Sequence, residues 1–225
     1  MNISIFDVTG PVMIGPSSSH TAGAAKLARI ARVIAARHVS HVVFGLHGSF
    51  ARTYKGHGTD KALVAGVLGI REDDERLVDA FSIAQQQGLT YEFEAIELEG
   101  VHENTVKFTF TLDNGEKSDV TGSSIGGARI IITHIGEFKV ELSAQTPVIL
   151  IQHQDKKGMV GAIANILARN DINIGTMKLS RRAKGDLAFS VIETDDSISE
   201  TVIADIKATD GVIFTQAINL ETGVL

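Results

Sequence analysis

The order of hydrophobic periods in the C-terminal part of the chain constrains the fold more than any other feature. Four short runs there have strand character, and two others carry apolar residues at helical spacing. In chain order these are strand 148–153, helix 158–168, strands 172–180 and 187–194, a helix capped by Ser199, and strand 212–220. This βαββαβ order within about 75 residues predicts a ferredoxin-like split βαβ domain.

A boundary between two domains is predicted at residues 143–147, Ser-Ala-Gln-Thr-Pro. This segment is small and polar, ends in proline, and lies between two strand-like runs. We therefore expect one domain over residues 1–146 and a second over residues 147–225. The first carries 13 basic and 17 acidic groups and the second carries 8 and 10, so neither part is a charged tail. Both should fold.

The N-terminal part has the pattern of a less regular α+β domain. Helices are expected over Thr21–Ala36, from a cap at Thr59 or Asp60 through Val67, and over Asp74–Gln87. Strands are expected at 42–46, 90–98, 105–112, 129–135 and 138–142, with a hairpin turn at Asp113-Asn114-Gly115. This content predicts a mixed or antiparallel sheet with helices on one side. The fold class of the whole chain is α+β.

The composition excludes several classes of function. The net charge is −6, and a chain with two Tyr, no Trp and no basic stripe is a poor nucleic-acid binder. The absence of cysteine rules out disulfides, a thiolate nucleophile and a Cys-ligated zinc or iron–sulfur cluster carried by this chain alone. No apolar run approaches the ~18–20 residues of a membrane span. Asp7 interrupts the apolar N-terminal stretch, which argues against a signal peptide and for a cytoplasmic protein.

The segment Gly15-Pro16-Ser17-Ser18-Ser19-His20-Thr21 precedes the first expected helix. Its hydroxyl groups and its histidine meet the free backbone N–H groups of a helix N-terminus, which suits a carboxylate or a phosphate. The alternative is a helix cap with more hydroxyl groups than a cap needs. We favour the anion site, because proline and three serines exceed what capping requires.

A second glycine-rich segment, residues 46–60, runs from a strand to a helix and ends in Gly56-His57-Gly58-Thr59-Asp60. Two glycines flank His57, so the backbone can turn sharply and leave the imidazole exposed. The segment lacks the Walker spacing that ends in Gly-Lys-Ser/Thr, so it is not a phosphate loop of that kind. A site loop and a structural turn with a surface histidine are both open interpretations.

Two further segments lie between expected strands. His102-Glu103-Asn104 holds a histidine that can act as a general base near neutral pH, or one that is satisfied within its own loop. Residues 118–127 are rich in hydroxyl groups and glycine, and we interpret them as a loop. That loop is either plain turn or a second wall of the site.

In the C-terminal part, Asp155-Lys156-Lys157-Gly158 joins a strand to a helix, and Asn173-Ile174-Gly175 opens the next strand. In a βαββαβ unit these two segments can lie close together and offer a helix N-terminus and an amide to an amino-acid-sized ligand. Many domains of this kind only dimerise. Ligand binding and pure dimerisation are therefore both open.

In combination these motifs resemble the beta chain of bacterial iron–sulfur-dependent L-serine dehydratase. The segments that carry the resemblance are 15–21, 56–60 and 102–104, and the likeness covers nearly the whole chain. The C-terminal part resembles an ACT domain, with Asp155 and Gly158 before its first helix and Asn173-Ile174 at its next strand.

The resemblance implies an allosteric-substrate-binding-like domain over 1–146 and an ACT domain over 147–225. It also implies an alpha chain that supplies the cysteines of a [4Fe–4S] cluster. The implied reaction is deamination of L-serine to pyruvate and ammonia through an initial elimination of water. A base removes the α-proton while an iron site with an open position accepts the β-hydroxyl as a Lewis acid.

The resemblance further implies roles for individual residues. His102 would be the base or support it, and His20 and His57 would position groups or handle protons. The substrate-binding set, which holds the carboxylate or shapes the interface, would be Ser18, Ser19, Thr21, Thr59, Asp60 and Asn104. The effector set would be Asp155, Gly158, Asn173 and Ile174, with serine or a monovalent cation such as potassium as effector. No metal ligand is expected in this chain, and ACT domains commonly associate with a second copy.

Two other functions were weighed against this one. A free-standing amino-acid sensor would bind serine without chemistry, and a cysteine-rich partner would give it no lyase activity. A hydrolase that uses Ser18 or Ser19 with His20 is disfavoured, because adjacent residues rarely offer nucleophile–base geometry. The sequence also has no Gly-x-Ser-x-Gly elbow.

Overall fold

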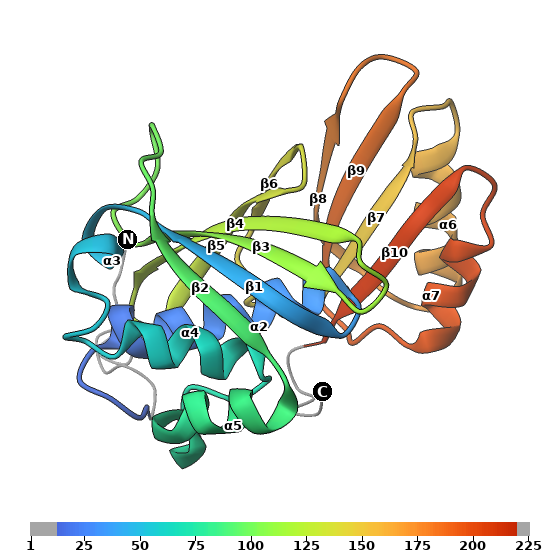
Figure 1. Ribbon diagram of the computed structural model, residues 1–225. Coiled ribbons are helices and arrows are strands. Elements are labelled where there is room, and N and C mark those ends of the chain that lie inside the picture. The colour runs from blue at the N-terminus through green and yellow to red at the C-terminus, as the bar shows by residue number, and fades with distance from the viewer. Residues whose placement is uncertain (1–12, 220–225) are drawn as a thin grey trace, which may run out of the picture. The chain divides into compact units, whose positions relative to one another are not determined.

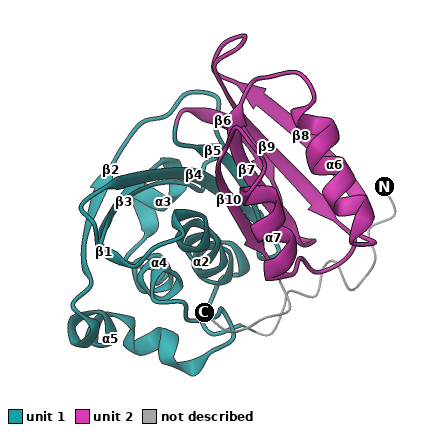
Figure 2. Ribbon diagram, turned by 90° about the vertical axis from the view of Figure 1, so that its right-hand side faces the viewer, with its two compact units in different colours: residues 1–136 teal, residues 137–225 magenta. Residues whose placement is uncertain are grey.

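The computed structural model describes residues 13–219 (Figure 1), and the chain divides into two compact units (Figure 2). Unit 1 ends at Gly136 and unit 2 begins at Glu137. Two expectations fall outside the described residues: the interruption of the N-terminal apolar stretch by Asp7, and the end of the last strand at Leu220.

Unit 1 is built on a mixed β-sheet (Figure 1). Its strands are β1 (Val39–Leu46), β2 (Thr90–Ala95), β3 (Thr105–Leu112), β4 (Lys117–Gly126) and β5 (Arg129–Ile135). They lie in the order β2-β1-β3-β4-β5. β1 pairs in parallel with β2, which a long helical connection between the two strands allows, and the other pairs are antiparallel. The expected mixed sheet is confirmed.

The helices of unit 1 cover one face of this sheet. They are α2 (Gly23–Ala35), α3 (Gly48–Thr53), α4 (Thr59–Val67) and α5 (Ala80–Gln87), with a π-helical turn η1 (Ser18–Ala22) and a 3₁₀ turn η2 (Glu75–Asp79). α2 packs on the sheet and α4 packs beside α2 (Figure 1). Between them lie fully buried rings of the strands, including Phe44, Phe108 and Phe110. Each such ring contributes about 1.5–3 kcal/mol by burial.

The first helical segment begins earlier than the expected Thr21, because Ser17 caps it. Ser17 Oγ accepts a hydrogen bond from the backbone N–H of His20 at 3.0 Å. The single π-turn η1 then leads directly into α2. One serine therefore suffices as the cap, and the hydroxyl groups of the two serines that follow are left for other contacts.

The start of α4 differs from the expectation in another way. Gly58 precedes the helix in the left-handed region, with φ of +68°, and neither Thr59 nor Asp60 caps it with a side chain. The expected cap is therefore wrong, because the glycine turn already sets the direction of the chain. The helix expected over 74–87 begins with η2, whose cap is Asp74, and continues as α5.

Residues 118–127, which the sequence suggested as a loop, lie mostly in strand β4. The strand pairs with β3 on one side and β5 on the other. Glycine at position 122 serves packing rather than a turn. A Cβ on Gly122 would lie 2.8 Å from the side chains of Leu27 and Ile132, so glycine lets α2 approach the sheet.

Unit 2 contains the expected βαββαβ order. Its elements are β6 (Phe138–Leu142), β7 (Val148–Gln154), α6 (Met159–Arg169), β8 (Ile174–Arg181), β9 (Leu187–Thr194), α7 (Glu200–Lys207) and β10 (Val212–Ile218). From β7 onward the strands form an antiparallel sheet in the order β10-β7-β9-β8. Ser199 caps α7 as expected, since its hydroxyl accepts a hydrogen bond from Val202 N–H. The ferredoxin-like arrangement is confirmed.

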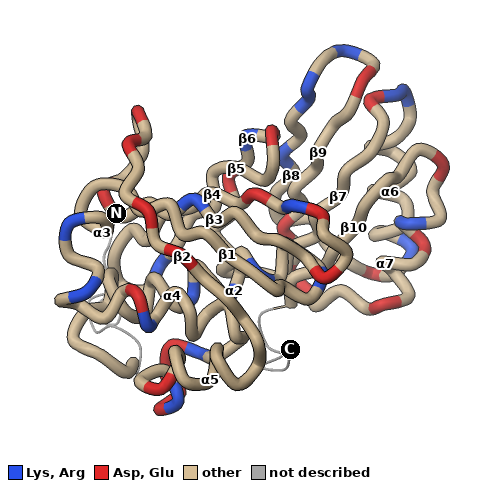
Figure 3. Tube along the Cα trace, viewed as in Figure 1, with Lys and Arg blue, Asp and Glu red and all other residues tan. Residues whose placement is uncertain are grey.

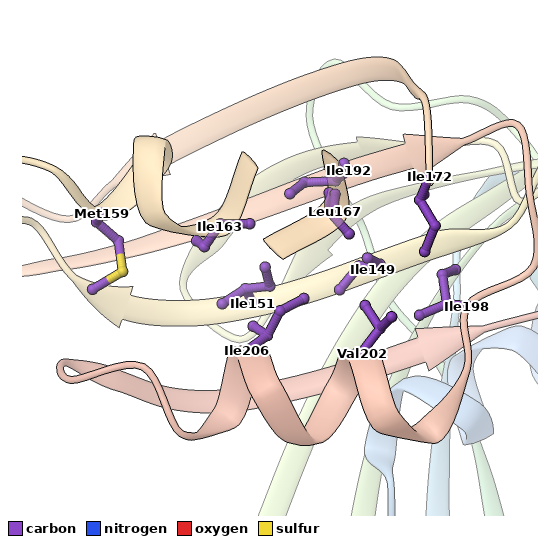
Figure 4. Packing of buried hydrophobic residues seen from close by; sticks show 10 residues of the cluster. All are labelled: Ile149, Ile151, Met159, Ile163, Leu167, Ile172, Ile192, Ile198, Val202 and Ile206. Carbon is purple, nitrogen blue, oxygen red and sulfur yellow. The ribbon is translucent and has the colours of Figure 1, made fainter. Parts of the chain in front are cut away.

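The core of unit 2 lies between its sheet and its two helices (Figure 4). Ile149 and Ile151 stand two residues apart on β7, so they point to the same face of the sheet. Ile163 and Leu167 of α6 and Ile206 of α7 pack over that face. The apolar residues that recur at strand and helix spacing in the sequence are therefore the ones that are buried in the core.

The two compact units divide between Gly136 and Glu137, before β6, and the domain boundary expected at 146/147 stays a prediction. Within unit 2, the ring of Phe138 lies 5.4 Å from the ring of Phe189 in β9. Glu141 forms an ion pair of 2.7 Å with Lys178 in β8. These contacts join β6 to β9 and β8.

Candidate functional site

Three histidine-bearing segments of unit 1 meet around the short helix α3. His20 Nε2 lies 3.1 Å from Ser49 Oγ, and the ring centroids of His20 and His57 are 4.9 Å apart. The loop of His102 is fastened to the same helix by a 2.8 Å hydrogen bond from Ser49 N–H to the carbonyl of Glu103. The structure thus brings together the segments that the sequence singled out separately.

His20 is held by its own helix start and by α3. Its ring stands edge-on to the buried ring of Phe50, with centroids 5.2 Å apart. Next to it, Thr21 Oγ1 donates a 3.0 Å hydrogen bond to the carbonyl of His57. Thr21 therefore fastens the His57 turn to the first helical segment.

His57 lies on the turn between α3 and α4 and is exposed. Its Nδ1 lies 3.4 Å from the carbonyl oxygen of Thr53. Because a carbonyl only accepts hydrogen bonds, Nδ1 carries the proton and Nε2 keeps its lone pair when the ring is neutral. His57 therefore presents a basic nitrogen.

His102 has the opposite arrangement. Its Nδ1 accepts a 3.1 Å hydrogen bond from the backbone N–H of Asn104, so a neutral ring carries its proton on Nε2. Its carbonyl accepts a 2.6 Å hydrogen bond from Thr105 Oγ1. The ring is exposed, and its loop uses the Nδ1 lone pair.

The His102 loop and α3 fit together closely. Gly48 has φ of +56°, and a Cβ there would lie 2.7 Å from the carbonyl oxygen of Glu103. Glu103 and Arg52 form an ion pair of 2.7 Å, and the guanidinium holds the pKa of the carboxyl below its usual value. Both side chains are exposed, so this pair aids position more than stability.

The hydroxyl groups of β4 connect the first and third segments. Ser124 Oγ donates a 2.9 Å hydrogen bond to the carbonyl of Ser19, and Ser124 N–H donates to the carbonyl of Asn104 at 3.0 Å. The buried hydroxyl groups of Ser123 and Thr105 lie 2.7 Å apart. Of the two interpretations of this segment, the geometry supports a wall of the site, built from a strand.

Two buried polar atoms at this site have unused hydrogen-bonding capacity. Thr59 Oγ1, two residues after His57, and Asn104 Oδ1, two residues after His102, have no hydrogen-bond partner among the described residues. Both side chains are buried, and an unsatisfied buried group costs about 1–3 kcal/mol. Such atoms mark places where a bound molecule can complete the site.

The Asp60 carboxylate bonds within its own helix. Its Oδ1 accepts a 2.8 Å hydrogen bond from the backbone N–H of Lys61. Burial first, and the Asp60 carboxylate second, raise the pKa of Tyr91. Asp60 therefore acts at the start of α4. The Ser18 hydroxyl forms no hydrogen bond within residues 13–219 and is free to meet a ligand.

Burial, and then the neighbouring charge of His57, lower the pKa of His20 below its usual value. The ring is therefore neutral over a wider range of pH than a free imidazole. Two histidines in contact cannot easily both be charged. The arrangement keeps a neutral imidazole beside His57.

The lowered pKa of His20 predicts a loss of stability in mild acid. The unfolded chain takes up this proton near the usual value of 6.5, above the pH at which the folded chain does. The contribution of His20 to the free energy of unfolding is therefore complete above pH 6.5. It is lost as the pH falls from there through the lower pKa of the folded chain. Both tyrosines, Tyr54 and Tyr91, lie in unit 1, so their fluorescence reports its unfolding alone. We expect the denaturant midpoint to fall from about pH 7.5 to about pH 5.5 more steeply than in the variant His20→Gln. If the midpoint fell equally steeply with pH in the parent and in His20→Gln, the lowered pKa of His20 would be contradicted.

Comparisons with known proteins point to one family. A family model described as serine dehydratase beta chain matches residues 4–134, and an ACT domain model matches residues 147–211. The chain is 43% identical over 210 residues to the "Probable L-serine dehydratase, beta chain" of Bacillus subtilis, covering 93% of this chain and 95% of that protein. It is 40% identical over 200 residues to the "L-serine dehydratase, beta chain" of Peptoniphilus asaccharolyticus, covering 88% and 90%. The chain belongs to the serine dehydratase beta-chain family.

A more distant match is to part of a different enzyme. This family member is 27% identical over 161 residues to the "D-3-phosphoglycerate dehydrogenase" of Bacillus subtilis, covering 71% of this chain and 30% of that protein. A solved ACT domain from a GTP pyrophosphokinase of Chlorobium tepidum matches 32% of this chain at 23% identity, with a TM-score of 0.28. That score is too low to bear on the fold.

In unit 2 of this member of the serine dehydratase beta-chain family, the expected effector residues lie in two separate places. β7 and β8 are each antiparallel to β9, so they run in the same direction. Asp155 follows the end of β7, whereas Asn173 precedes the start of β8. The two residues therefore stand at opposite ends of β9, about 23 Å apart along an eight-residue strand. The expectation that one chain brings these segments together is wrong.

Each half of that set has its own local partners. The Asp155 carboxylate accepts a 2.9 Å hydrogen bond from Gly185 N–H, which lowers the pKa of Asp155. Gly158 precedes α6 with φ of +88°. Asn173 Nδ2 donates a 2.6 Å hydrogen bond to Asp195, and Ile174 begins β8 beside Thr194.

Sequence reasoning missed Ser49 and the helix that carries it. α3 has six residues, too few to show a helical period, so its segment was interpreted only as a loop. The available signal was Gly48, because a glycine directly before a serine fits a tight entry into a helix. Ser49 links the His20 segment to the His102 loop.

Within residues 13–219 no three histidine, cysteine, aspartate or glutamate side chains are grouped as a metal would require. Among the same residues no helix is long and apolar enough to cross a membrane.

Proposed function

We propose that this chain is the beta subunit of a two-chain, cytoplasmic L-serine dehydratase that is active only with its alpha chain. The α-proton and the β-hydroxyl of L-serine leave as water, and the resulting enamine takes up water and releases pyruvate and ammonia. The observation that carries the proposal is the convergence of the three histidine segments on α3. Such a step needs a neutral base held beside the substrate α-carbon.

The hydrogen bonds favour His57 as that base. Its Nδ1–H donates to Thr53, so the Nε2 lone pair is available, and the ring is exposed to a substrate. His20 lies against it and is kept neutral by burial, so it adds no fixed positive charge. His102 uses its own Nδ1 lone pair within its loop, and we therefore reassign it from base to a positioning role or to proton donation from Nε2.

The remaining groups suit the two ends of an amino acid. Ser18 and Ser19 lie at the start of η1, where hydroxyl groups and free N–H groups favour a carboxylate. Within residues 13–219 Thr59 Oγ1 and Asn104 Oδ1 lack partners, and Oδ1 accepts a hydrogen bond from an ammonium or a hydroxyl group. Thr21 fastens the His57 turn and has no need to touch the substrate.

The residues of this chain do not fit an iron–sulfur cluster. The chain has no cysteine, and its described residues form no group of three ligating side chains. We therefore assign the [4Fe–4S] cluster to the alpha chain, where it supplies Lewis acidity toward the substrate hydroxyl. What this chain supplies is substrate binding and proton transfer.

The ACT domain of unit 2 is proposed to regulate the enzyme through serine or a monovalent cation such as potassium. Asp155 and Asn173 stand at opposite ends of its sheet. A site that uses both segments therefore has to form between two copies of the domain. Self-association through this domain is part of the proposal.

The test is the anaerobic conversion of L-serine to pyruvate by this chain alone, by a cluster-loaded alpha chain alone, and by the mixture. We expect pyruvate only from the mixture, because neither chain holds both the cluster and the histidines. Turnover by this chain alone would contradict the division of labour. Absence of turnover from a mixture whose chains associate would contradict the proposed reaction.

One observation favours a second candidate, a serine-sensing module without chemistry. The match to D-3-phosphoglycerate dehydrogenase covers most of this chain but less than a third of that enzyme. A region shared by a dehydratase chain and a dehydrogenase serves more than one chemistry. If this chain binds serine while the mixture makes no pyruvate, the sensor is the correct function.

A further inference from the structure

Strand β2 forms an open edge of the sheet in unit 1. Among residues 13–219 it stands at the end of the strand order and pairs with β1 alone (Figure 1). Half of its backbone N–H and C=O groups therefore face away from the sheet. Such an edge accepts another extended chain as an additional strand.

This edge carries charge of one sign (Figure 3). Residues 90–99 contain four glutamates and no lysine or arginine, which gives the segment a formal charge of −4. The four, all exposed, are Glu92, Glu94, Glu97 and Glu99. Glu92 lies 4.0 Å from His41, and within residues 13–219 the other three form no ion pair. The edge therefore favours a partner rich in lysine or arginine.

A hollow lies beside the start of the same strand. α5 and the start of β2 border an open hollow of about 590 Å³, lined in part by Phe81, Gln85, Leu89 and Tyr91. The rings of Phe81 and Tyr91 are stacked at 5.5 Å and form an apolar surface. An apolar side chain of an added strand can settle there, which gives the edge a second point of recognition.

We propose that the β2 edge binds an extended, lysine- or arginine-bearing segment of the alpha chain as an added strand. A second copy of this chain is disfavoured, because pairing two β2 edges sets glutamates against glutamates. The strand also leads into the site: Ile96 N–H donates to Leu46, Leu98 N–H donates to His47 Nδ1, and His102 follows. A partner on this edge is thus aligned with the histidines. The choice of the alpha chain rests on the proposed function.

The first test uses the full chain and a synthetic peptide that alternates valine and lysine over about nine residues. We expect binding, and slowed amide hydrogen exchange in residues 90–99. Affinity should fall when NaCl rises from about 50 to about 200 mM. A peptide with glutamate in place of lysine, or with alternate amides N-methylated, should not bind. Equal binding of the glutamate peptide, no binding of the lysine peptide, or protection only elsewhere would overturn the proposal.

A second test changes the edge itself. The variant Glu94→Gln/Glu97→Gln removes two unpaired charges, and we expect it to weaken peptide binding roughly threefold or more. The matched control Glu75→Gln/Glu200→Gln removes two exposed charges elsewhere and should bind as the parent does. Equal affinities in the two variants would contradict charge recognition by this edge.

The same variants separate this proposal from the proposed function. In the mixture with the alpha chain, Glu94→Gln/Glu97→Gln should raise the alpha-chain concentration at half-maximal turnover and leave kcat unchanged. An unchanged half-maximal concentration with normal turnover would refute the edge and leave the enzyme intact. If no variant or parent turns over serine, the proposed function fails, and the peptide experiment still decides whether the edge binds.

Discussion

Replacing His57 with Ala is expected to lower kcat of the mixed two-chain enzyme by more than about 100-fold. The variant loses the nitrogen whose lone pair is free, because Nδ1–H donates to Thr53 and leaves Nε2 basic. The ring of His20 is held at α3, with its Nε2 3.1 Å from Ser49 Oγ, and so does not occupy the place of the lost ring. The measurement is the anaerobic rate of pyruvate formation at saturating L-serine and alpha chain.

Three comparisons show whether the loss is one of a base. His38→Ala removes an exposed histidine that has no described side-chain bond, and it should keep turnover within about twofold. Added imidazole should restore part of the rate to His57→Ala. His102→Ala should lose less than His57→Ala. A His57→Ala enzyme with near-normal kcat, or a larger loss in His102→Ala, would refute the assignment and return the base to His102.

Unit 2 could be predicted almost completely from its sequence. Its helices bury one stripe of apolar residues, so period and burial coincide, as at Ile163 and Leu167. Its turns contain glycine in the left-handed region, such as Gly185 and Gly211. Each local preference there agrees with the final fold, which is why element order and type could be read without tertiary information.

Unit 1 was less predictable where tertiary contacts decide the local structure. Gly122 suggested a turn, although it lies within β4 because Leu27 and Ile132 leave no room for a side chain. Thr59 has the chemistry of a helix cap, but the left-handed Gly58 before it makes that cap unnecessary. A single sequence shows residue types, and such contacts depend on which segments meet.

The same limit applies to the candidate site. Residue chemistry identified His20 and His57, which stand among hydroxyl groups and glycines, and the position between two expected strands together with the family resemblance identified His102. It could not tell which histidine is the base and which has another role, because that depends on which ring nitrogen already forms a hydrogen bond. Nor could it find Ser49, whose importance lies in joining segments far apart in the sequence.

A glycine that no motif marks is expected to control the stability of unit 1. Gly66 lies inside α4, where α2 and α4 pack against each other. A Cβ there would overlap the carbonyl oxygen of Ala25 and would lie 2.6 Å from Ala28 Cβ and 2.9 Å from the backbone nitrogen of Arg29. Two of these three atoms belong to the backbone, so no rotamer change relieves the contact.

Gly66→Ala therefore sets two effects against each other. Alanine improves helix propensity by about 1 kcal/mol, whereas forcing two helices apart costs about 3 kcal/mol, the upper end of the usual range, because backbone must move. We expect a net loss of about 2 kcal/mol, seen as a lower denaturant midpoint in tyrosine fluorescence, which reports unit 1 only. Gly161→Ala, in α6 with no neighbour within 4 Å of its Cβ, should leave that midpoint unchanged. A midpoint for Gly66→Ala at or above the parent's would mean that α2 and α4 can separate without loss. Close packing of these helices would then not be what holds η1 and the His57 turn together.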